Sequence, residues 1–141
     1  MSGTCIDRSI QLRISEGTRF LESILAACKF SFGELKSSAV PQNPGVYVVY
    51  EEDVAVYVGT TGSLRRRIVN NLWAGRNHYL ATHLMRDKLP GGRRRLQEYL
   101  ASHCTFRFCE TGDKAEARWL EHFIISVLRP KYNAGSAAFR D

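Results

Sequence analysis

Residues 45–62 read GVYVVYEEDVAVYVGTTG, and this stretch decides the expected fold. Two short runs of β-branched and aromatic residues flank the acidic triplet 51–53, which is the pattern of a β-hairpin. If the triplet is a three-residue loop, Tyr47 lies directly opposite Tyr57, with both phenols on one face. Such a pair either packs as part of the core or places a hydroxyl that orients water or moves a proton.

Upstream of the hairpin, the sequence predicts one helix and a loop. Residues 1–16 show no clear period, so we expect a loose arm there. From 17 to 35 apolar residues recur at intervals of three and four, as in an amphipathic helix. The Ser-, Pro- and Asn-rich segment 37–45 then ends this helix.

Downstream of the hairpin, helical patterns dominate. Ser63 is a suitable N-cap for a helix that runs to about Trp73. The Leu-Pro-Gly-Gly segment 89–92 is a strong break between two further helices. The remaining expected elements are helices at 78–88, 93–102 and 114–128 and a strand at 105–109.

Length and composition indicate one domain of an ordinary globular protein. The chain has 141 residues, of which 44% are hydrophobic and 24% charged. It contains no apolar run long enough to span a bilayer, and its start lacks the pattern of an export signal. We therefore expect a cytoplasmic protein without a membrane partner.

Positive charge is concentrated in one part of the chain. The net charge is +6, and the segment 65–95 holds nine bases against the single acid Asp87. So one-sided a segment favours contact with nucleic acid over a merely solvated face. The expected nucleic-acid-binding residues are Arg65, Arg66, Arg76, Arg86, Lys88, Arg93, Arg94 and Arg95.

Two charged residues fall near apolar helix faces. Glu121 lies at the edge of the apolar arc of the last helix, where a carboxylate needs a partner. A structural salt bridge and a metal ion are both possible partners. Arg67 lies one helical turn after the glycine-containing turn, where it could clamp a phosphate or pair with Glu121.

Five short motifs, taken together and in order, resemble the GIY-YIG nuclease superfamily. In particular they are similar to a small stand-alone member resembling the N-terminal nuclease domain of the bacterial excision-repair endonuclease. They cover about residues 45–133. The motifs are Gly45-Val-Tyr47, Tyr57-Val-Gly59, Ser63-Leu-Arg-Arg-Arg67-Ile68, Glu116-Ala-Arg-Trp-Leu-Glu121 and Arg129-Pro-Lys-Tyr-Asn133.

The resemblance implies an α+β (α/β) fold: a single domain with a small central three-stranded antiparallel sheet flanked by helices. The nuclease domain would occupy 41–141, with 1–40 as an arm and helix packed on it. A helical, arginine-rich insert at about 74–103 would have no counterpart in the minimal domain.

The resemblance also implies the chemistry of the site. One divalent cation, Mg²⁺ or Mn²⁺, would be bound mainly by Glu121. Tyr47 or Tyr57 would help to activate water, while Arg67 stabilises the phosphate in the transition state. Catalysis would further need Asn133 as a hydrogen-bonding support, and Gly45, Gly59 and Asn71 would shape the site.

Two positions depart from the pattern of the superfamily. Thr60 stands where some members carry lysine, so no cation adjoins the second tyrosine in the sequence. Asn71 stands where histidine or tyrosine is frequent, and it cannot act as a general base. Two histidines on the following segment, His78 and His83, are the auxiliary candidates for this role.

The sequence thus predicts a divalent-metal-dependent endonuclease that hydrolyses phosphodiester bonds in DNA, favoured over RNA, in repair, recombination or turnover. One alternative is a nucleic-acid-binding module without catalysis. The other is a nuclease toxin or defence effector. Because no separate DNA-reading module is visible, specificity would come from the insert or from a partner protein.

Overall fold

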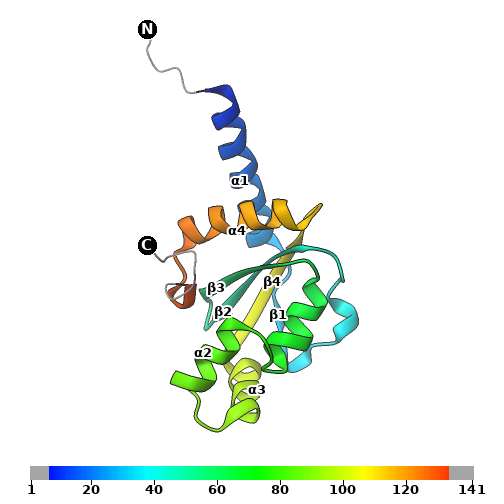
Figure 1. Cartoon of the computed structure of the whole chain (residues 1–141), viewed down its shortest axis with the longest axis vertical. Coiled ribbons are helices and arrows are strands. Elements are labelled where there is room, and N and C mark those ends of the chain that lie inside the picture. Colours follow the sequence, from blue (N-terminus) through cyan, green and yellow to red (C-terminus); the bar gives the residue numbers. More distant parts are fainter. Residues whose placement is uncertain (1–6, 134–141) are drawn as a thin grey trace.

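A four-stranded antiparallel sheet with the order β1-β4-β2-β3 forms the centre of the molecule (Figure 1). The structure is a computed structural model and describes residues 7–133. The predicted three strands are confirmed, and a two-residue strand adds to the edge beside β4. The strands are β1 Phe30–Ser31, β2 Gly45–Glu51, β3 Val54–Thr61 and β4 Cys104–Glu110.

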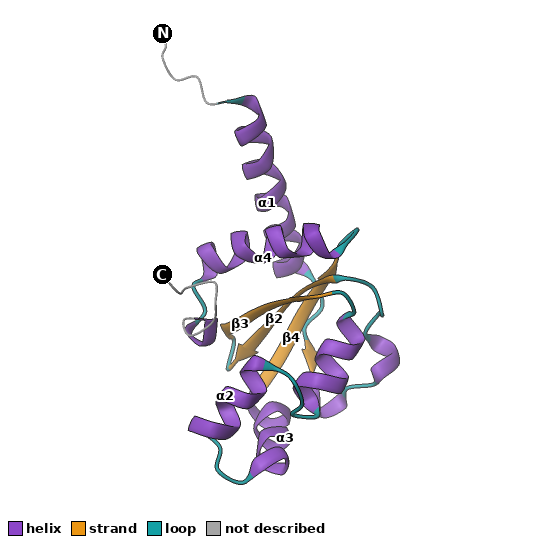
Figure 2. Cartoon of the chain, viewed as in Figure 1, coloured by secondary structure: helices purple, strands orange, loops and turns teal. Residues whose placement is uncertain are grey.

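Helices cover both faces of this sheet (Figure 2). One core cluster joins the sheet to α1 and α4, and the other joins it to η3, α2 and α3. The long helices are α1 Arg8–Ala26, α2 Tyr79–Asp87, α3 Gly92–His103 and α4 Lys114–Leu128. The short helical segments are η1 Phe32–Glu34, η2 Ser37–Ala39, η3 Arg66–Trp73 and η4 Lys131–Asn133. Within residues 7–133, none of the helices combines the length and apolarity needed to cross a bilayer.

The register of the hairpin differs from the prediction. Tyr47 pairs with Gly59 and Tyr57 with Val49, so the two tyrosines are not directly opposite. The turn has two residues, Glu52 and Asp53, both in the left-handed conformation, which shifts the pairing by one residue. A β-bulge shifts it by one more. Because two shifts restore the alternation of side chains, both phenols still lie on the same face.

The first helix begins earlier and ends earlier than predicted. Residues 8–16, expected in a loose arm, form the first half of α1, while residues 1–6 lie outside the described part. The Asp7 side chain caps the helix by accepting a hydrogen bond from the Ser9 backbone N–H (2.8 Å). The helix stops at Ala26 because Phe30 is drawn to the sheet edge, where its ring stacks on Phe106 at 5.6 Å.

Candidate active site

Tyr47 and Tyr57 occupy the sheet face that carries η3 and α2. Their ring centroids are 6.2 Å apart. Tyr47 is fully buried, whereas Tyr57 keeps 7% of its surface exposed. Gly59 makes this packing possible, since a Cβ at that position would collide with the Tyr47 ring. The two phenols are therefore held in contact, with Tyr57 nearer the surface.

A buried histidine completes a row of three side chains. The Nε2 atom of His78 lies 2.7 Å from the Tyr47 hydroxyl oxygen. At the same time, Nδ1 of His78 accepts a hydrogen bond from the Leu80 backbone N–H (3.1 Å) and so caps α2. Since an accepting Nδ1 carries no proton, the neutral ring carries it on Nε2 and donates it to Tyr47.

Burial controls protonation in this row. It lowers the pKa of His78 to about 3, with a contribution from Arg67, so the imidazole is neutral at physiological pH. Burial also raises the pKa of Tyr57 to about 12 and that of Tyr47 well above its usual value. Neither phenol is therefore ionised at neutral pH in the metal-free protein.

Arg67 reaches the same region from η3. This segment is π-helical, a geometry that is often found at functional sites. The Arg67 Nη1 atom donates a hydrogen bond of 2.6 Å to the backbone carbonyl of Asn77. Asn77 is in the left-handed conformation, and this turn directs its carbonyl at the guanidinium just before His78 enters the core. The guanidinium also hydrogen-bonds with the Tyr47 side chain, and its planar set of donors is suited to an anion.

Glu121 lies on α4, and the charges of Glu121 and Arg67 both act on Tyr47 and Tyr57. Burial raises the pKa of its carboxyl to about 7, although Arg118 and Arg67 lower it and so does a hydrogen bond from the Thr60 backbone. Within the described part of the chain, Glu121 forms no ion pair. Both sequence-based alternatives, a salt bridge and a metal ion, stay predictions.

Asn133 lies in η4 and is tied to the edge strand β3. Its Oδ1 accepts a hydrogen bond from the Val58 N–H (2.8 Å), and its Nδ2 donates one to the Val58 carbonyl (2.9 Å). The amide thereby takes the place of a neighbouring strand beside Tyr57. This contact secures η4 against the sheet and holds the outer tyrosine in place.

The donor set suits a magnesium-like ion. Within residues 7–133, no three His, Cys, Asp or Glu side chains gather into a group that could hold a metal. The carboxylate next to the tyrosines and Arg67 is that of Glu121, which is half-buried and whose pKa is raised to about 7 by burial. Mg²⁺ is commonly held by one or two carboxylates together with water and substrate phosphate, so the residues fit such an ion.

The other predicted site residues lie around this centre. Gly45 allows a close approach of β4 and of the segment before η3, since a Cβ there would lie 2.5 Å from the Cys109 carbonyl oxygen and 2.7 Å from the Leu64 side chain. Asn71 contributes its backbone carbonyl, which accepts a hydrogen bond from Arg76 N–H (2.9 Å). His83 does not touch Tyr47, and its ring contacts Tyr79 and Tyr132 instead.

The basic residues are more dispersed than the sequence suggested. Arg65 donates to the Val40 carbonyl (2.8 Å), and Arg86 pairs with Asp87 (2.9 Å). Glu98, just beyond the basic segment, approaches both Arg94 (3.6 Å) and Arg95 (3.3 Å). Within residues 7–133, the predicted binding residues without an ion pair are Arg65, Arg66, Arg76, Lys88 and Arg93.

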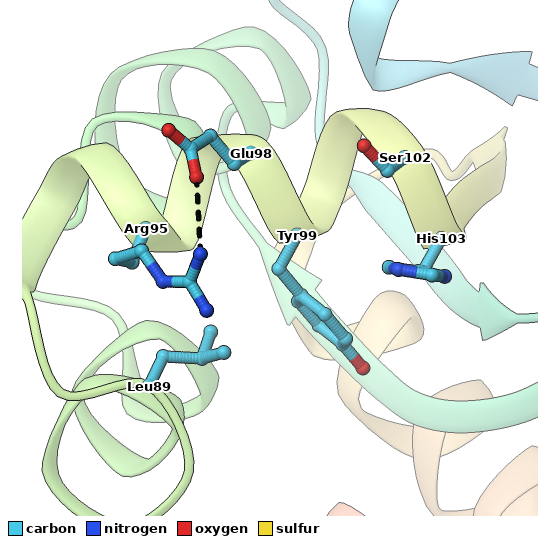
Figure 3. Close-up of a pocket in the computed structure, with 6 residues that line it drawn as sticks. All are labelled: Leu89, Arg95, Glu98, Tyr99, Ser102 and His103. Carbon is cyan, nitrogen blue, oxygen red and sulfur yellow. Dashed lines mark hydrogen bonds and ion pairs between the residues drawn. The ribbon is translucent and has the colours of Figure 1, made fainter.

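A separate hollow of about 280 Å³ lies along α3 (Figure 3). Its cation, Arg95, points to Glu98, and its Tyr99 hydroxyl binds the carboxylate of Glu51. None of its lining residues belongs to the candidate active site.

Sequence reasoning missed two aromatic residues that do adjoin the site, Tyr79 and Tyr132. The position of Tyr132 directly before Asn133 was the available signal.

Comparisons with known proteins find relatives of this chain. The chain matches no protein-family model. It is 33% identical over 95 residues to UvrABC system protein C of Rhodospirillum rubrum, and 30% identical over 101 residues to that of Moorella thermoacetica. These matches cover 67% and 71% of this chain but only 12% and 14% of the relatives. Over about two thirds of its own length, the chain is therefore similar to UvrABC system protein C.

Solved structures include the GIY-YIG N-terminal endonuclease domain of UvrC from Thermotoga maritima, bound to its catalytic cation, magnesium. Its sequence identity to this chain is 23% and the TM-score is 0.43, over 70% of this chain and 91% of that domain.

Proposed function

We propose that this protein is a divalent-metal-dependent endonuclease that cuts DNA, with Glu121 as the ligand of one Mg²⁺ ion. The convergence of Tyr57, Arg67 and Glu121 from three separate elements carries this proposal. A half-buried carboxylate with a raised pKa beside an arginine is costly for a fold and useful for phosphate chemistry.

The side chains have distinct roles in the proposed reaction. Arg67 contacts the scissile phosphate and neutralises the charge that grows in the transition state. His78 donates to Tyr47, and a hydrogen bond from Tyr47 lowers the pKa of Tyr57. This row orients the Tyr57 hydroxyl toward the attacking water. When bound, the cation polarises the phosphate and increases the acidity of water.

A role in DNA repair or DNA turnover is the proposed setting, because the similar proteins are UvrC proteins. The chain spans only 12% to 14% of the length of these two relatives. Partner proteins and a cytoplasmic location are further parts of the same proposal.

A cleavage assay tests the proposal. Wild type is incubated with plasmid, single-stranded, branched DNA and RNA, in magnesium and in chelator. We expect magnesium-dependent cutting of DNA, abolished in Glu121→Gln, which removes the charge and keeps the shape. The control Glu116→Gln changes an exposed carboxylate on the same helix and leaves cutting intact. Binding of DNA without cleavage under all conditions would favour the non-catalytic binding module.

A further inference from the structure

A pocket of about 270 Å³ opens directly beside the candidate active site, where α2 begins. His78 belongs to both, since it lines the pocket and its Nε2 contacts Tyr47. Asn77, also in the lining, holds Arg67 through its backbone carbonyl (2.6 Å). Whatever occupies this pocket therefore lies next to the group that would contact phosphate.

Aromatic rings lead from the catalytic tyrosines into this pocket. The Tyr79 ring centroid is 6.3 Å from that of Tyr57 and 6.1 Å from that of His83. His83 in turn lies 5.5 Å from the Tyr132 ring, and Asp87 fixes its Nδ1 at 3.1 Å. The pocket thus offers ring surfaces held in place by neighbouring side chains.

The charge of the pocket favours a neutral ring over a phosphate. Its one fixed cation, Arg86, is paired with Asp87 through hydrogen bonds of 2.9 Å from both Nε and Nη2. Besides the rings of His78, Tyr79 and His83, the lining has the side chains of Asn77 and Thr82, which are uncharged and exposed. Aromatic faces with neutral donors and acceptors are what nucleic-acid-binding proteins use for unpaired bases.

We propose that this pocket binds the unstacked base of a nucleotide adjacent to the phosphate held by Arg67. The inference rests on the proposed nuclease function and narrows its substrate class. A pocket of this size takes one base and not a base pair. The protein then prefers DNA with an unpaired nucleotide at the cut, such as single strands, flaps or bulges, over continuous duplex.

Binding measurements with abasic substitutions test this proposal without cleavage. All chains carry Glu121→Gln, and the probe is a single-stranded oligonucleotide in which each base in turn is removed. We expect removal of one particular base to weaken binding roughly tenfold, which is within the range for one base on an aromatic ring. Tyr79→Leu should weaken binding of the intact strand by a similar factor. For the strand that lacks that base, the Tyr79→Leu variant and its parent should bind with the same affinity.

Two matched variants serve as controls. Tyr79→Phe keeps the ring and should bind as the parent does, while Trp119→Leu removes an exposed ring from α4 and should change nothing. Binding to duplex without unpaired nucleotides should change less than twofold in every variant. His83→Leu, expected to show the same dependence on the base, replaces Tyr79→Leu if melting shows that the latter does not fold.

The proposal is overturned if removal of no single base weakens binding of the oligonucleotide. It is also overturned if the loss of affinity from base removal and the loss from Tyr79→Leu multiply in the combined measurement, or if Tyr79→Leu weakens binding of duplex as much as binding of the single strand. The last result would indicate a contact with the phosphate backbone. Cleavage plays no part in this measurement. If wild type fails to cut with magnesium, the nuclease function is refuted. The binding measurement still decides whether a base occupies the pocket.

Discussion

Tyr57 and Tyr47 share one face of the hairpin but differ in access, because Tyr57 alone retains exposed surface. We expect Tyr57→Phe to slow single-turnover cleavage by roughly 10²- to 10⁴-fold, the usual contribution of a group that handles a proton or orients water. Tyr47 acts through Tyr57, so Tyr47→Phe should slow single-turnover cleavage by a smaller factor. Melting curves must show folded variants. If both cut as fast as wild type from pH 6 to 9, the phenols are core residues and another group, such as His83, activates water.

The carboxyl of Glu121 should make the metal-free protein less stable as the pH rises. Its pKa is about 7 in the folded chain against an ordinary value of 4.5, so the folded state binds more protons between these values. Stability from this group is then fully present below about pH 4.5 and lost as the pH rises through 7. In chelator at pH 8, Glu121→Gln should exceed wild type by about 1–3 kcal/mol in unfolding free energy. Equal stability of the two chains at pH 8 in denaturant titrations would argue against this charge burial.

Among the elements, η4 is fixed to the edge of the sheet by the Asn133 side chain. Asn133 satisfies both the N–H and the carbonyl of Val58 at the edge of β3. Asn133→Ala should cost about 1–3 kcal/mol for each group left without a partner, and it should slow cleavage because Tyr57 loses its support. Asn133→Asp keeps the acceptor but sets a buried carboxylate oxygen against the Val58 carbonyl, so it should be at least as destabilising. Denaturant unfolding of both variants measures the difference, and an alanine variant as stable as wild type would contradict the role.

The first turn of α3 provides a test of the arginine-rich insert. Replacing Arg93, Arg94 and Arg95 by glutamine should weaken DNA binding and flatten its dependence on salt, while turnover of bound substrate stays near wild type. Arg67→Ala should do the reverse, with turnover reduced by orders of magnitude and a modest loss of binding. Glu98 already approaches two of the three arginines. We therefore expect the slope of log affinity against log salt concentration to fall by less than the amount that three phosphate contacts would give. Normal binding of the triple variant at all salt concentrations would place the DNA groove elsewhere.

At the scale of the whole molecule, folding and metal binding should be separable. Two apolar clusters, one on each face of the sheet, hold the helices without any metal-ligand group among the described residues. We expect chelator to leave the melting temperature of purified protein unchanged, while added Mg²⁺ raises it modestly at pH 8 by binding only the folded state. Glu121→Gln should remove that increase. A protein that unfolds in chelator would show a structural metal instead.

Local sequence patterns determined most of the elements of this protein. The hairpin, the strand near 105–109 and the helix at 114–128 follow from alternation, helical period and turn residues, which act between near neighbours in the chain. The same patterns pointed to Tyr47, Tyr57, Arg67 and Glu121, because each is polar or charged at a position that a packed face makes costly. The fold class and the similarity to UvrC follow from these residues in order.

Tertiary structure alone decided the details on which function depends. The two-residue turn and the bulge set the hairpin register. Alternative turns and registers differ little in free energy, and a pattern of alternating residues does not distinguish them. The early end of α1 depends on stacking between Phe30 and Phe106, which are far apart in the sequence. The selection of His78 over His83 likewise required the left-handed turn at Asn77 and the cap on α2. Burial is a property of the assembled core, and so the pKa values near 3, 7 and 12 arise only when distant segments exclude water together.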